Sequence, residues 1–109
     1  MAKTMTINYN GVEYTLEYTR KSIAEMERKG FVASEVSDKP ASQLPLMFAG
    51  AFYAHHRYVK QSLIDEIFDS IGNKSGLISA LADMYQEPIL ALVEDAEESE
   101  GNAVWTANF

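Results

Sequence analysis

The stretch that decides the fold is "TMTINYNGVEYTLEY", residues 4–18. It contains two alternating apolar and polar runs separated by Asn10-Gly11, the residue pair preferred in type I′ turns. A two-residue loop fixes the register and puts the apolar side chains of both runs on one face. The pairs are Tyr9 with Val12, Ile7 with Tyr14, and Met5 with Leu16. The sequence therefore predicts a β-hairpin whose apolar face must be covered by helices or by a partner chain.

A short surface helix is predicted after the hairpin, over residues 20–29. Thr19 is suited to the N-cap position, and Tyr18 and Ile23 have the spacing of a hydrophobic staple. Gly30 is a natural end, because glycine accepts the positive φ that follows many helices.

The most apolar part of the chain follows a predicted loop over residues 32–43. It is "LPLMFAGAFYAHHRYV", residues 44–59, in which Pro45 is suited to a first helical turn. A helix that is apolar around most of its circumference is contacted by neighbours on several faces. We therefore expect a central helix over residues 44–59.

Two amphipathic helices are predicted next, over residues 62–71 and 76–93, and Pro88 should kink or break the second one near Gln86 or Glu87. The fold class is α+β and predominantly helical, with the N-terminal hairpin followed by four to five helices. Residues 1–93 form a single globular domain, and residues 94–109 form an acidic tail with an aromatic end.

Composition narrows the functional classes. The chain of 109 residues suits one domain, and because it has no cysteine, disulfides, thiolate metal sites and cysteine nucleophiles are excluded. The first ten residues contain no apolar segment typical of a secretion signal. The longest apolar run, residues 44–54, is too short to span a bilayer. These features predict a cytoplasmic protein.

The net charge of -7 is unevenly distributed. Residues 1–60 hold eight Lys/Arg and six Asp/Glu, whereas residues 61–109 hold one lysine and ten Asp/Glu. Such asymmetry predicts either head-to-tail self-association or a basic partner. It argues against nucleic acid as a partner, because binding phosphates needs clustered Lys/Arg.

No motif predicts catalysis, a cofactor or a metal. His55 and His56 are adjacent, so on a helix they point about 100° apart and cannot share one metal ion; structural or surface roles are favoured. Asp65, Glu66 and Asp69 would lie on the solvated face of a helix, where acid–base chemistry is not supported. The sequence therefore predicts a non-enzymatic protein.

Two aromatic groups are candidates for partner binding. In residues 48–58, "FAGAFYAHHRY", the aromatic side chains belong either to the core or to a binding face. The candidates there are Phe48, Phe52, Tyr53 and Tyr58. In the tail, Trp105 and Phe109 are either solvated or anchored in an apolar groove. That groove would lie on this chain, on a neighbouring copy or on another protein.

The layout of residues 5–95 resembles a known family. Residues 18–27 read "Y-T-x-K-S-I-x-x-M-E", and residues 45–55 read "P-L-x-F-A-G-A-F-x-x-H". These two short sequence motifs follow the hairpin and precede the amphipathic helices and the acidic end. In this arrangement the chain resembles the tail assembly chaperones of long-tailed bacteriophages, in their short form.

The resemblance implies a non-enzymatic protein of the host cell cytoplasm that is absent from the mature virion. Such a protein binds and solubilises the tape-measure protein, helps the tail-tube protein assemble around it, and self-associates. A longer form made by ribosomal frameshifting often accompanies it. Two other classes remain open: a small acidic phage or bacterial regulator that inhibits a basic partner, and a structural connector of the virion.

Overall fold

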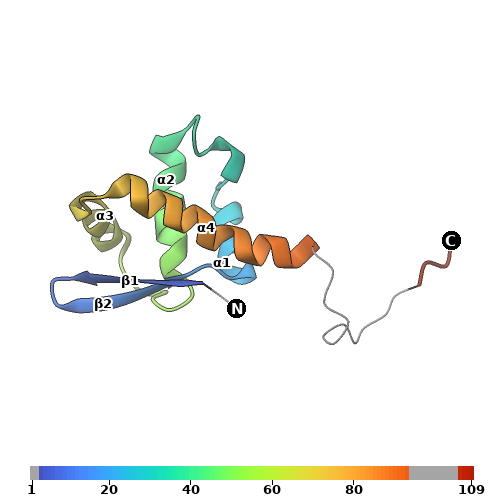
Figure 1. Ribbon diagram of the computed structural model, residues 1–109, viewed down its shortest axis with the longest axis horizontal. Helices are drawn as coiled ribbons and strands as arrows, with labels where there is room; N and C mark the ends of the chain where they lie inside the picture. Colours follow the sequence, from blue (N-terminus) through green and yellow to red (C-terminus); the bar gives the residue numbers. More distant parts are fainter. Residues whose placement is uncertain (1–2, 94–105) are drawn as a thin grey trace.

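The computed structural model describes residues 3–93 and 106–109. Within these residues, a two-stranded antiparallel sheet precedes four α-helices and one short 3-10 helix. The elements are β1 (Thr4–Tyr9), β2 (Val12–Glu17), α1 (Arg20–Arg28), η1 (Ala33–Glu35), α2 (Pro40–Phe52), α3 (Gln61–Ser70) and α4 (Lys74–Val93). Figure 1 shows the hairpin along one edge, with the helices gathered on one side of it. The fold is α+β and predominantly helical, as the sequence predicts.

The hairpin has the predicted register. Tyr9 pairs with Val12, and the partners continue outward to Thr4 and Glu17. Asn10 and Gly11 both have positive φ, as the central residues of a type I′ turn must. The apolar face is covered by helices of the same chain, with Tyr14 and Leu16 of β2 buried in the core.

The start and the end of α1 also follow the sequence. Thr19 and Ser22 form a capping box in which the hydroxyl of each accepts the backbone N–H of the other, at 3.0 Å and 2.8 Å. After the helix, Gly30 takes a φ of 103°, a conformation that favours glycine. The helix turns Ile23 and Met26 into the core and leaves its charged residues on the surface.

The central position of α2 is confirmed. This helix contacts β2, α1, α3 and α4, and Figure 1 shows α4 crossing it. Phe48, Ala51 and Phe52 are almost completely buried. The hydroxyl of Tyr18 donates a hydrogen bond to the carbonyl oxygen of Met47 at 2.5 Å, which fixes α2 against the end of the hairpin.

The predicted bounds of this helix, residues 44–59, are wrong at both ends. It begins at Pro40, whose fixed φ suits the first turn, so the helix includes Pro45 in its interior. It ends at Phe52, because the chain then turns toward β2, where His55 contacts Glu17 and His56 contacts Thr15. Apolar periodicity carries no signal for that departure, since the apolar pattern continues through Tyr53 and Ala54.

The predicted loop of residues 32–43 is correspondingly shorter and contains η1. Gln43, which the sequence assigns to the loop, is buried in the first part of α2. Its side-chain oxygen accepts the backbone N–H of Val32 at 2.8 Å, and its amide nitrogen donates to the Gly30 carbonyl at 3.3 Å. This side chain therefore satisfies backbone groups of the connection between α1 and η1.

The last two helices lie close to their predicted places, but α4 is not broken at Pro88. It runs as one helix from Lys74 to Val93. A proline inside a helix removes one backbone hydrogen bond, here the bond to the carbonyl of Met84. Met84 and Ile89, on either side of that position, both pack on the core, and this burial maintains the helix.

The acidic run of the predicted tail lies outside the described residues, as does Trp105. In the part of the chain that the structure describes, no helix combines the length and the apolar character needed to cross a membrane.

Candidate functional site: two apolar surfaces

A groove lies between α1, α2, the segment after α2, and α3. It has a volume of about 380 Å³ and is open to solvent. We call it the groove and define it by Met26, Lys29, Leu46, Ala49, Arg57 and Ile64. Its volume lies within the range of sites that hold small ligands or the side chains of a peptide.

Close contact between α1 and α2 forms the floor of the groove. A Cβ added at Gly50 would lie 2.3 Å from the sulfur of Met26, which is buried. A side chain at position 50 would therefore force the Met26 side chain out of its place between α1 and α2. With Ala49 beside it, the floor is made of small residues and of the methionine side chain.

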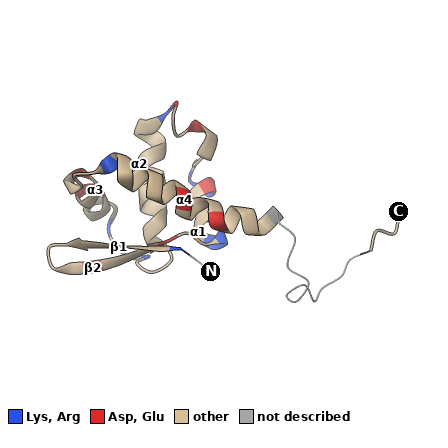
Figure 2. Ribbon diagram, viewed as in Figure 1, with Lys and Arg blue, Asp and Glu red and all other residues tan. Residues whose placement is uncertain are grey.

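Charged side chains border the groove. Glu25 is bound by Arg28, whose Nε donates to Oε2 at 2.9 Å and whose terminal nitrogen contacts Oε1. These hydrogen bonds lower the pKa of Glu25, partial burial opposes them, and the positive charges of Arg28, Lys29 and Arg57 lower the pKa further. The Arg57 guanidinium lies over the Tyr53 ring at 4.7 Å from its centroid. With Glu25 paired to Arg28, Lys29 and Arg57 are the positive charges that line the groove, and Figure 2 shows basic and acidic residues side by side on α1.

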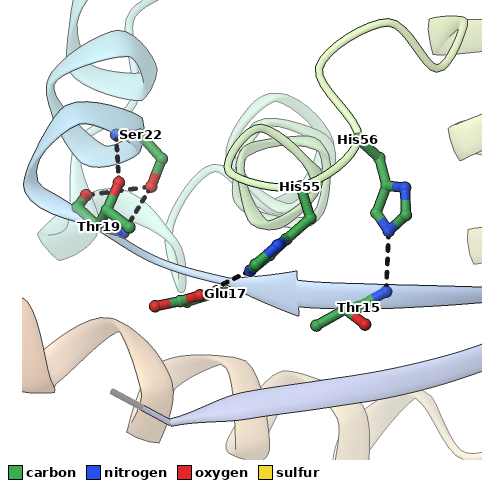
Figure 3. A network of polar contacts seen from close by, with 6 residues as sticks. All are labelled: Thr15, Glu17, Thr19, Ser22, His55 and His56. Atoms are coloured by element: carbon green, nitrogen blue, oxygen red, sulfur yellow. Dashed lines mark hydrogen bonds and ion pairs between the residues drawn. The ribbon is translucent and has the colours of Figure 1, made fainter. Parts of the chain in front are cut away.

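A polar network holds the segment after α2 on the hairpin (Figure 3). Nε2 of His56 accepts the backbone N–H of Thr15 at 2.9 Å, so this nitrogen carries no proton in that contact. Nε2 of His55 lies 2.7 Å from Oε1 of Glu17. The two histidines contact different partners along β2, and their roles are structural.

The partly buried ring of His56 also contacts two aromatic residues of the core. It packs edge-on against Tyr14, with centroids 5.3 Å apart, and lies 6.4 Å from Phe52. Among residues 3–93 and 106–109, no three His, Cys, Asp or Glu side chains are grouped as a metal site would need.

The second apolar surface is the C-terminal end of α4, which extends beyond α1 in Figure 1. Leu90 and Leu92 keep 45% and 54% of their surface exposed. Leu92 borders a hollow of about 190 Å³ between α4 and α1, whose lining also includes Ile23, Pro88 and Ile89. Leu90, two residues away, points to another side of the helix. We call this surface, defined by Ile23, Ala24, Pro88, Ile89, Leu90 and Leu92, the α4 end.

The structure separates the aromatic candidates that the sequence groups together. Phe48 and Phe52 are buried, so they belong to the core, one of the two interpretations that the sequence allows. Tyr53 is half-buried at the groove, and Tyr58 is 92% exposed outside it. Phe109 is fully exposed and lies in no groove of its own chain.

The sequence did not predict either of these two candidate surfaces. The groove has no signal in the sequence, because its lining comes from three helices and a loop. The α4 end has one: "ILALV", residues 89–93, places five apolar residues in succession. A helix surrounded by its own domain on one side only cannot bury such a run.

Comparison with known proteins gives one match. A family model described as a domain of unknown function (DUF5055) matches residues 1–109. Neither the curated proteins nor the solved structures contain a match to the chain.

Proposed function

The chain therefore belongs to the DUF5055 family, and we propose that it is a non-enzymatic phage tail assembly chaperone. In this role it binds the tape-measure protein in the host cell cytoplasm, keeps it soluble and helps the tail-tube protein assemble around it. The family match assigns no activity, so the proposal rests on the resemblance of residues 5–95 and on one observation of the structure.

That observation is the uncovered apolar surface of the α4 end. Leu92 lies on the last turn of the helix and borders a hollow that α1 and Pro88 also line, while Leu90 exposes a second side of the same helix end. A surface of this kind accepts the apolar stripe of another helix, whose side chains enter the hollow. A tape-measure protein exposes such helical stripes before the tail tube surrounds it.

The free energy that the α4 end can contribute to binding suits a reversible complex. Complete burial of a leucine side chain is worth about 1.5–3 kcal/mol, so the exposed halves of Leu90 and Leu92 contribute about 1 kcal/mol each. Ile89 and Ile23 add less, because they are already half-buried or buried. A chaperone must release its client when the tube forms, and repeated weak contacts allow this.

The acidic charge supports solubility of the complex. The negative charge lies in residues 61–109, which include α4 and hold ten Asp/Glu and one lysine. A like-charged surface beside an apolar site opposes aggregation while the site is occupied.

The experiment is co-expression of the chain with the tape-measure protein of its phage. We expect soluble tape-measure protein that co-purifies with the chain. The double variant Leu90→Ser/Leu92→Ser should lose both solubility and co-purification. The control Val12→Ser/Val32→Ser removes two other aliphatic side chains of similar exposure, 49% and 44%, and should retain both. An insoluble tape-measure protein with the unchanged chain would refute the proposal.

Salt distinguishes this function from that of an acidic regulator. Binding through the α4 end should persist at high ionic strength, because apolar contacts are not screened. Binding to a basic partner that weakens steeply with salt would favour the regulator.

A further inference from the structure

We propose that the groove binds residues 94–109 of a second copy of this chain, so that copies associate head to tail. The groove and the α4 end are different surfaces. The inference therefore goes beyond the proposed function and does not require the tape-measure protein.

Charge complementarity is the first reason. Residues 94–100 hold five carboxylates, the densest acidic stretch of the chain. Two cations, Lys29 and Arg57, line the groove, and Arg28 of α1 lies beside it, bound to Glu25. Two carboxylates also line the groove: Glu25, which Arg28 binds, and Asp65, which accepts a hydrogen bond from Gln61 at 2.9 Å. Because Arg28 offsets Glu25, Lys29 and Arg57 outweigh Asp65, and the groove keeps a small positive excess for the incoming carboxylates.

The shape and polarity of the groove are the second reason. Its volume of about 380 Å³ is lined by Met26, Leu46, Ala49 and Ile64, and Tyr53 stands at its border. Trp105 and Phe109 follow the acidic stretch and are four residues apart. Aromatic side chains bury a large area at a low cost in conformational entropy, which makes them effective anchors for such a groove. The order of the tail, carboxylates and then aromatics, matches a groove whose cationic border surrounds an apolar floor.

The tail that occupies the groove belongs to a second copy, because the described end of the chain, residues 106–109, does not lie in the groove of its own chain. All of the residues 106–109 are exposed, and Phe109 touches no apolar surface of its own chain. Figure 1 shows them far from the helices. The twelve residues between α4 and this end, 94–105, reach at most about 40 Å, enough to cross a neighbouring copy. Tail and groove are different surfaces, so the contact is heterologous and extends to rings or open chains.

The first test uses the single tryptophan of the chain, Trp105, as a reporter of the tail. Its emission should shift to shorter wavelength as the protein concentration rises, because docking removes the indole from water. A blue-shifted emission that does not depend on concentration would mean docking within one chain. Emission typical of exposed tryptophan at every concentration would mean no docking. Either result would overturn the inference.

The second test mixes two variants that each disable one side of the contact. The tail variant is Trp105→Ala/Phe109→Ala, and the groove variant is Ala49→Glu. Each alone should sediment as a monomer of about 12.2 kDa. Mixed, they should form a complex of about twice that mass and no larger, because one intact tail meets one intact groove.

Controls keep this outcome interpretable. Circular dichroism checks that Ala49→Glu folds, and Arg57→Glu, on an exposed residue, is the second groove variant. Leu90→Ser/Leu92→Ser should self-associate like the unchanged chain, so failure of the proposed function is distinguishable from failure of this inference. Single variants that still associate, or a mixture that stays monomeric, would overturn it.

Discussion

The two adjacent histidines should differ strongly in their contribution to stability. The change is His56→Ala, compared with His55→Ala as a matched control. His56 accepts the backbone N–H of Thr15 at 2.9 Å and packs on Tyr14 and Phe52, whereas His55 makes a contact with Glu17 at the surface.

The magnitudes follow from these environments. Removing the His56 ring leaves a partly buried backbone N–H without its acceptor, which costs about 1–3 kcal/mol. Loss of edge-on ring contacts adds about 0.5–1.5 kcal/mol. We therefore expect a loss of about 2–4 kcal/mol for His56→Ala. An exposed ion pair is worth at most about 1 kcal/mol, which sets the upper limit for His55→Ala.

Urea unfolding followed by far-ultraviolet circular dichroism measures both values, since a single domain of this size usually unfolds in two states. Tryptophan fluorescence is unsuitable, because Trp105 lies after the helices. Equal losses for the two variants, or a larger loss for His55→Ala, would refute the structural role assigned to His56.

Three further changes test the core and the caps. Thr19→Ala removes the N-cap of α1 and should cost about 1 kcal/mol, read as a melting temperature lower by about 4–8 °C. Burial raises the pKa of Tyr18 above its usual 10, so its phenol, bound to Met47, should stay protonated in the fold. The stability it contributes is present below pH 10 and decreases above it, and Tyr18→Phe should flatten that alkaline decrease in unfolding experiments. Gly50→Val places atoms against the Met26 sulfur and should cost about 1–3 kcal/mol, part of which Met26→Ala should recover in a double-mutant cycle.

The local rules of the sequence predicted the hairpin and α1 well. Alternation around Asn10-Gly11 admits one register, since a shift of one residue would expose the apolar face. Thr19 and Gly30 are signals that act within a few residues of the helix ends they define.

Longer-range contacts explain what the sequence could not predict. Gln43 is polar, but its burial is favoured because two distant backbone groups bond to it. The end of α2 at Phe52 depends on His56 reaching β2, a partner more than forty residues away. The groove likewise exists only after α1 and α2 meet at Gly50, so no segment of the sequence carries its signal.

Hydrogen exchange of the chain, alone and bound to the tape-measure protein, tests most directly whether the α4 end is the binding surface. Amides in the last turns of α4, residues 85–93, and in α1 should gain protection on binding, while β1 and β2 should change little. Protection confined to the hairpin, or no change in α4 despite binding, would contradict the proposed function.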